Sequence, residues 1–143
     1  MTYLSCFFAC FLLVLAYPTA KTDNVVGIWW TDDKNARIEI ENRNGKYWGK
    51  IVWVRDPYES NGKLKVDSNN PDKSQRTNPI VGVTLLKGFE FVDGEWKNGK
   101  IYNPENGKDY SGILTLKNKN TLEVRGYLGF SFVGQTTVWT RYE

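Results

Sequence analysis

Histidine is absent from this chain of 143 residues, and cysteine and methionine are rare, with two Cys and one Met. Histidine is the commonest general base and the commonest transition-metal ligand in proteins, so its absence removes both roles at once. Both cysteines, Cys6 and Cys10, lie within the first twenty residues. A chain that has lost this stretch has no disulfide, cysteine nucleophile or thiolate metal site. We therefore expect neither a metal nor a cofactor.

Runs of like charge are also missing. The 19 basic residues are spread among 16 acidic ones, which leaves a formal net charge of only +3. Nucleic-acid and membrane-surface binders usually concentrate basic residues in a run or patch. We therefore expect no nucleic-acid partner.

The long apolar run of the chain lies at its N-terminus, from Leu4 to Ala16. It is too short for a helix that spans a bilayer, and its length matches the apolar region of a secretory signal. The sequence thus predicts a signal peptide over residues 1–20, cleaved after Ala16 or after Ala20. The predicted product is a single domain, residues 21–143, exported to the periplasm or the extracellular space without a membrane span. A retained membrane anchor is the alternative.

The rest of the chain repeats one unit, a polar turn with glycine followed by a strand of alternating residues. In 99–112, for example, Pro104 and Asn106-Gly107 form a turn between two extended arms. About eight strands follow from this pattern, over 27–31, 36–41, 46–55, 83–92, 95–102, 109–117, 121–127 and 135–142. Such spacing is typical of an all-β sandwich or up-and-down antiparallel barrel, and sequential hairpins favour the barrel. Glycines 49, 112 and 126 fall on the expected inner faces, where a closing sheet bends or side chains lack room.

One segment interrupts this rhythm. Residues 56–78 form a long polar insert, and connections of this length are usually functional or disordered. Within it, Asn70-Pro71-Asp72 has the composition of a helix start, which predicts a short helix from Pro71 to Thr77.

The two ends of the domain carry a pair of complementary motifs. Gly27-Ile28-Trp29 opens the first strand, and Trp139-Thr140-Arg141 ends the last. A guanidinium stacked on an indole stabilises by roughly 0.5–2 kcal/mol, and here it would join the first strand to the last. The pair resembles the lipocalin and wider calycin signature, in which the Trp plugs one end of the barrel and the Arg lies across it. The resemblance implies that Gly27, Trp29, Trp139 and Arg141 close the barrel.

From Gly27 onward the chain also resembles the bacterial family known as domain of unknown function 2147. The matching segments are Gly27–Trp29, Gly49–Trp53, Asn69–Asp72, Pro79–Gly82, Gly99–Gly107, Arg125–Gly129 and Trp139–Arg141. The resemblance implies a lipocalin-like barrel in an exported protein. It implies no activity, because none is assigned to the family.

Inward-facing strand residues are the candidates for a binding site. A barrel of this size either fills with side chains or keeps a cavity for one small molecule. We predict a small apolar or amphipathic ligand inside the barrel, with the 56–78 insert covering the mouth. The candidate ligand-binding residues are Tyr47, Ile51, Trp53, Tyr110, Leu114, Leu122 and Val124.

Two other functions stay open. In the first, the barrel is filled, and an envelope protein partner binds an outer apolar patch of Trp48, Val52, Val54 and Tyr127. The second is an enzyme that uses Asp, Glu, Tyr or Lys, and it is the least favoured. The carboxylate pairs Asp32-Asp33 and Glu39/Glu41 are expected in a turn and on a solvated face, and the helix cap explains Asp72.

Overall fold

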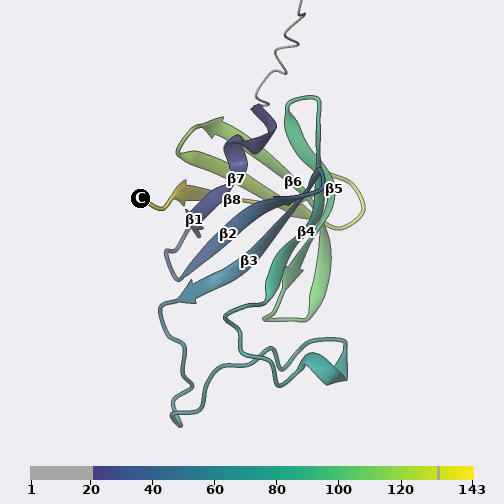
Figure 1. The fold of residues 1–143 in the computed structure, drawn as a ribbon. Coiled ribbons are helices and arrows are strands. Elements are labelled where there is room, and N and C mark those ends of the chain that lie inside the picture. Colours follow the sequence, from purple (N-terminus) through teal and green to yellow (C-terminus); the bar gives the residue numbers. More distant parts are fainter. Residues whose placement is uncertain (1–20, 132) are drawn as a thin grey trace, which may run out of the picture.

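Eight antiparallel strands form a closed barrel in chain order, and β8 pairs with β1 to complete the ring (Figure 1). The computed structural model describes residues 21–131 and 133–143. The strands are β1 (Gly27–Trp30), β2 (Ala36–Arg43), β3 (Lys46–Val54), β4 (Thr84–Val92), β5 (Glu95–Asn103), β6 (Lys108–Asn118), β7 (Thr121–Tyr127) and β8 (Gly134–Arg141). The predicted up-and-down barrel is therefore confirmed, with strand bounds close to the expected ones. The predicted signal peptide lies outside the described residues.

Turn chemistry accounts for the tight hairpins. Asn44-Gly45 and Asp93-Gly94 both have two consecutive residues with positive φ, at 54° and 86° and at 52° and 83°. This conformation matches the twist of two-residue hairpins, and Asn, Asp and Gly adopt it most easily. In the longer β5–β6 turn only Gly107 has positive φ, at 70°. The polar turn residues thus direct each strand back along its neighbour.

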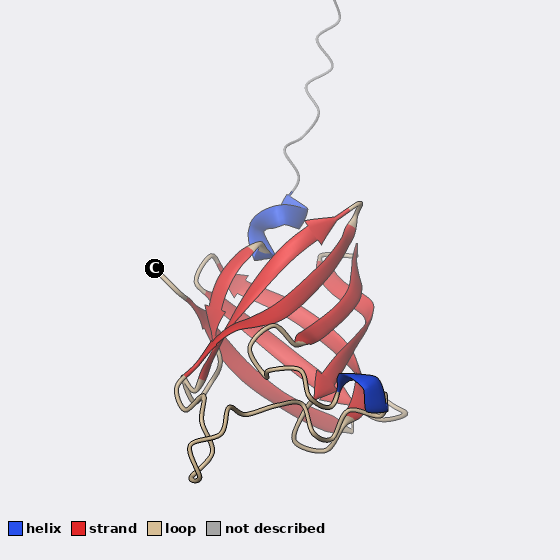
Figure 2. Ribbon diagram, turned by 60° about the horizontal axis from the view of Figure 1, so that its bottom comes forward, coloured by secondary structure: helices blue, strands red, loops and turns tan. Residues whose placement is uncertain are grey.

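The barrel has two distinct ends because the strands alternate in direction. At one end lie the turns 44–45, 93–94 and 119–120 together with the N-terminal 3-10 helix η1 (Lys21–Val25). We call this the closed end. At the other, the open end, lie the connections 31–35, 55–83, 104–107 and 128–133. Figure 2 shows η1 over one end of the barrel and the long 55–83 connection at the other.

The closed end is plugged by the predicted Trp–Arg contact. The guanidinium of Arg141 lies 4.2 Å from the ring centroid of Trp29, which is fully buried. Arg141 donates to the backbone oxygens of Asn24 and Val26 at 2.6 and 3.0 Å and to that of Lys119 at 2.6 Å. These bonds tie together η1, β1, the β6–β7 turn and β8. Burial lowers the pKa of the Arg141 guanidinium from its ordinary value.

Glycine at position 27 makes this plug possible. A Cβ there would lie 2.7 Å from Arg141 Nη1, and the φ of 138° also disfavours other residues. The indole of Trp29 donates from Nε1 to the carbonyl of Val25 at 2.8 Å, which fixes η1 over the barrel.

Large side chains fill the barrel between its middle and the closed end. The core includes Ile38, Ile40, Leu86, Phe89 and Trp96, each at most 1% exposed. Glycines on the neighbouring strands leave space for these large side chains. A Cβ at Gly49 would lie 2.9 Å from Leu86, and Cβ atoms at Gly99 and Gly112 would lie 2.4 and 2.6 Å from the Phe89 ring. Gly49 and Gly112 therefore do what their inward position predicts, which is to make room for a neighbour's side chain.

The expected helix of the insert is reduced to one 3-10 turn, η2 (Lys73–Gln75). Its N-cap is Asp72, whose side chain accepts from the Ser74 N–H. Asn70 instead accepts from the Asp72 N–H at 2.9 Å and donates to Asp67 at 2.8 Å. Because these bonds hold Asn70 in a turn, the helix starts later than Pro71 and stays short. Among the described residues, no helix is long and apolar enough to cross a membrane.

Candidate functional site

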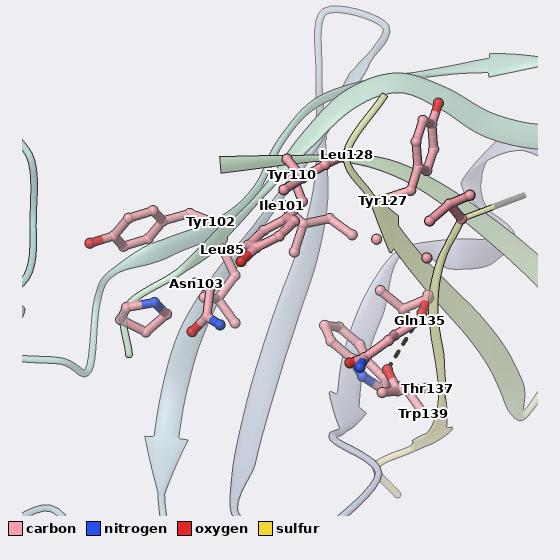
Figure 3. Close-up of a pocket in the computed structure, with 15 residues that line it drawn as sticks. Leu85, Ile101, Tyr102, Asn103, Tyr110, Tyr127, Leu128, Gln135, Thr137 and Trp139 are labelled. Atoms are coloured by element: carbon pink, nitrogen blue, oxygen red, sulfur yellow. Dashed lines mark hydrogen bonds between the residues drawn. The ribbon is translucent and has the colours of Figure 1, made fainter. Parts of the chain in front are cut away.

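A cavity of about 690 Å³ occupies the open end of the barrel (Figure 3). Its apolar and aromatic lining consists of Leu85, Ile101, Tyr102, Tyr110, Val124, Tyr127, Leu128, Val133 and Trp139. Three polar residues, Asn103, Gln135 and Thr137, and the small residues Pro104, Gly126 and Gly134 complete it. The volume is within the range of pockets that hold small organic molecules.

Strand register explains how this wall forms. Across β7 and β8, Val124 is opposite Thr137 and Gly126 is opposite Gln135, and all four face the interior. A Cβ at Gly126 would make ordinary contacts, 3.7 Å from Tyr110 and 3.8 Å from Ile101. The side chains around Gly126 leave room for a Cβ, in contrast to those around Gly99 and Gly112. The interior therefore stays hollow here.

The wall of the cavity is electrically neutral, since none of its fifteen residues is charged. The one tyrosine next to a carboxylate points elsewhere: Tyr102 donates its hydroxyl to Asp67 at 2.7 Å, and Figure 3 shows its ring turned away from Gln135, Thr137 and Trp139. Burial, and then the hydrogen bond to Asp67, raise the pKa of Tyr102 well above its ordinary value. Tyr110 is also engaged, because its hydroxyl accepts from Asn106 at 2.8 Å.

The structure divides the predicted binding residues into three groups. Tyr110 and Val124 line the cavity. Tyr47, Ile51, Leu114 and Leu122 face the interior as expected, but they belong to the packed core, with at most 4% exposure, and do not line the cavity. The prediction placed these residues on the correct face and could not tell which end of the barrel is filled.

Trp53 is the exception, because it lies outside the barrel. Arg37 pairs with Trp53 and the next residue, Ile38, pairs with Ile51, so Val52 is an extra residue in β3. Such a bulge reverses the alternation that follows it. Outside, the Arg37 guanidinium lies 4.5 Å from the Trp53 ring centroid, and it contacts Trp30 and Tyr142 at 4.5 and 4.1 Å.

The outer apolar patch proposed from the sequence does not form. Trp48 and Val52 are half-buried on β3, and the Arg43 guanidinium lies 5.5 Å from the Trp48 ring. Val54 turns inward after the bulge and packs against the core. Tyr127 is on β7 and lines the cavity. The four residues thus share no continuous surface.

The 55–83 connection lies at the open end, where Ile80 and Val83 pack against the core, and it contributes no residue to the cavity lining. Its buried Asp67 accepts the Tyr102 hydroxyl, and Asn69 Nδ2 donates to the carbonyls of Pro104 and Glu105 at 3.1 and 2.9 Å. The expectation that this insert covers the mouth was wrong. Tyr102 faces outward from β5, and the insert shields its ring from solvent on that side.

Several cavity residues were missed by the sequence reasoning, notably Ile101, Gln135 and Thr137 on β5 and β8. Trp139 was assigned only to barrel closure, yet it also lines the cavity. A signal was available. In an up-and-down barrel, inward residues near the ends of β5 and β7 and the starts of β6 and β8 meet at one end, and Gly126 lies on the inward face there.

Asp33 and Asp72 accept hydrogen bonds from neighbouring residues in the chain. Hydrogen bonds from Asn35 and Thr31 lower the pKa of Asp33, and bonds from Ser74 lower that of Asp72. Within the part of the chain that the structure describes, no cluster of three or more Asp, Glu, Cys or His side chains could hold a metal ion.

A closed eight-stranded antiparallel barrel, plugged at one end and hollow at the other, places the protein in the lipocalin-like class. The chain belongs to the family described as "Uncharacterized protein conserved in bacteria (DUF2147)", whose model matches residues 27–141. Among solved structures it is similar to protein HP1028 of Helicobacter pylori, described as a member of the lipocalin family, with 26% identity over 82% of each chain and a TM-score of 0.71. No curated protein matches the chain.

Proposed function

We propose that this protein binds a small apolar or amphipathic molecule in the cavity at the open end of its barrel. The observation that carries the proposal is the cavity itself, about 690 Å³ in volume with a mainly apolar lining. Val124 and Trp139, at 5% and 6% exposure, form its sheltered wall. Leu128 and Val133, at 60% and 59%, lie at the exposed mouth.

The energetics favour such a ligand. Removing apolar surface from water stabilises by about 25 cal/mol per Å², so burying ~250 Å² of ligand surface contributes roughly 6 kcal/mol before the cost of association. A packed interior would offer no such gain. The barrel holds an unfilled volume beside aromatic rings, which are effective surfaces for apolar contact.

Filling the cavity tests the proposal. Gly126→Leu adds a side chain into the hollow region at a position with ordinary backbone geometry, where a Cβ meets no atom closer than 3.7 Å. We expect titration with the neutral fluorophore N-phenyl-1-naphthylamine to give saturable binding to the natural protein. Gly126→Leu should reduce this affinity at least about tenfold, since the added side chain occupies the space of the ligand.

The matched control is Thr140→Leu, which adds an apolar side chain to an exposed position on β8. It should leave the fluorophore affinity unchanged. Equal binding by the natural protein and Gly126→Leu would show that the fluorophore binds elsewhere. Native mass spectrometry of protein purified from its host would then give the mass of any molecule carried in the barrel.

Export is part of the same proposal, and the apolar run from Leu4 to Ala16 supports it. The N-terminal sequence of the protein isolated from its host tests it. A start at residue 17 or 21 agrees with cleavage, and a start at Met1 contradicts it.

A further inference from the structure

We infer that the cavity selects uncharged amphiphiles, such as long-chain alcohols or amides, and rejects carboxylates of the same chain length. This inference rests on the proposed function, because it specifies the class of ligand that the same cavity takes. It is carried by the absence of any formal charge among the fifteen lining residues.

Charged side chains on the surrounding elements are directed away from the cavity. Arg125 on β7 donates to the Ser131 carbonyl at 2.7 Å and to Thr136 Oγ1 at 2.8 Å. Lys87 on β4 pairs with Asp109 at 3.1 Å and lies 4.8 Å from the centroid of the Tyr102 ring, which is turned away from the rest of the cavity wall. Neither cation is in the wall, so neither is placed to neutralise an anionic headgroup.

The nearby carboxylate and the exposed charges of the β5–β6 hairpin are also outside the wall. Asp67 is 2% exposed and reaches only the far side of Tyr102, through the hydroxyl of that residue. Glu105 and Lys108 are exposed and do not line the cavity. On β8 the inward residues at the mouth are Gln135 and Thr137, and both are neutral.

The polar groups that do face the cavity suit an uncharged headgroup. Gln135 offers amide donors and an amide acceptor, which can pair with both functions of a hydroxyl or an amide. Asn103 offers its amide donors, while its Oδ1 accepts from the Glu105 N–H at 2.9 Å. A carboxylate is an acceptor only, and it would exchange its hydration for neutral donors without a countercharge. The mouth is open to water, so the ionised group would lose only part of its hydration there, and this partial loss still costs more free energy than it does for a neutral polar group.

The lining also gives the ligand a direction. The sheltered wall, formed by Val124 and Trp139, is apolar, whereas Gln135 is exposed at the start of β8. We therefore expect the hydrocarbon part to lie against the sheltered wall and the neutral headgroup to lie beside Gln135.

Competition between two ligands of equal chain length tests the inference. N-phenyl-1-naphthylamine bound to the natural protein is displaced with 1-decanol or with decanoate at pH 8, where the carboxylate is ionised. We expect decanol to bind at least about tenfold more tightly than decanoate, because only the carboxylate loses hydration without a countercharge. Equal binding, or tighter binding of decanoate, overturns the inference and leaves the proposed function intact. Failure of the fluorophore itself to bind overturns the proposed function.

A charge introduced at the mouth provides the second arm. Gln135→Lys places an ammonium group beside the expected headgroup, and Gln135→Met is the neutral control of similar length. The lysine variant should bind decanoate about tenfold more tightly than the natural protein, while the methionine variant should not, because a salt-assisted hydrogen bond needs the charge. Circular dichroism verifies that both variants keep the strand content. No gain for decanoate in a folded Gln135→Lys variant overturns the inference.

Discussion

The closed and open halves of this barrel are built from the same eight strands, yet one is solid and the other hollow. In the closed half, Phe89 lies against Gly99 and Gly112 so tightly that a Cβ on either glycine would overlap its ring. Gly126, the direct partner of Gly112 on β7, lies where the cavity begins and has room for a Cβ beside Tyr110 and Ile101. Glycine thus serves opposite purposes along one interior. It admits a large side chain in one half and leaves space in the other.

Stability and the proposed binding site therefore lie in different parts of the interior. The plug of Trp29 and Arg141 and the packed aromatic residues contribute stability at the closed end. The open end provides apolar surface that no side chain of the barrel covers. Substitutions in the closed half should therefore lower mainly the free energy of unfolding, and those in the open half should lower mainly the ligand affinity.

Truncation of the plug should have the largest effect. Trp29→Ala removes a fully buried indole and should lower the free energy of unfolding by about 3–5 kcal/mol. Truncation at the mouth, Val133→Ala, removes a side chain that is 59% exposed. It should change the free energy of unfolding by less than about 0.5 kcal/mol. Guanidinium denaturation measures both, and similar losses would contradict the division into two halves.

Overpacking should be the next largest effect. Gly99→Ala places a methyl group 2.4 Å from the Phe89 ring, and the resulting strain should cost about 1–3 kcal/mol. Gly126→Ala should cost less than about 0.5 kcal/mol because its Cβ meets only ordinary contacts. Adding Phe89→Leu to Gly99→Ala should relieve part of the strain, so the double variant should lose less than the sum of the single variants.

Tyr102→Phe should have a moderate effect that depends on pH. It removes the hydroxyl that Asp67 accepts and leaves this buried carboxylate short of a donor, at a cost of about 1–3 kcal/mol at pH 7. Burial and Asp67 raise the pKa of Tyr102 in the folded protein, so the unfolded chain releases this proton first as pH rises. The natural protein should therefore lose stability above about pH 10, and Tyr102→Phe should lose less. Urea unfolding midpoints between pH 8 and 11 measure how the stability of each protein depends on pH. The same pH dependence in both proteins would contradict the raised pKa of Tyr102.

The smallest effect is expected at the rim. Leu128→Ser replaces a side chain that is 60% exposed, so the free energy of unfolding should change by less than about 0.5 kcal/mol. Because Leu128 also lines the mouth, fluorophore affinity should fall by about two- to threefold through the lost apolar contact. A stability loss without any change in binding would place Leu128 in the packed half.

Much of the fold could be predicted because it depends on local patterns. Two-residue periodicity located all eight strands, and Asn-Gly and Asp-Gly pairs located three of the turns, at 44–45, 93–94 and 106–107. The Trp29–Arg141 contact was expected from the resemblance to the lipocalin signature, and it agrees with the pairing of the first and last strands that closes the barrel. The alternation failed at Trp53, because the bulge at Val52 leaves no mark in residue type.

The cavity could be predicted only in part. Tyr110 and Val124 were expected to face inward, which is a property of strand alternation that the residue order carries, and both line the cavity. Leu114 and Leu122 have the same alternation and the same chemistry, yet they lie in the solid half. The order of residues along the chain therefore decides the strands, the turns and which side chains face inward. Three-dimensional packing decides which of those side chains meet others and which face a cavity, because filled volume depends on neighbours far apart in the chain, as Phe89 against Gly112 and Gly126 beside Tyr110 demonstrate.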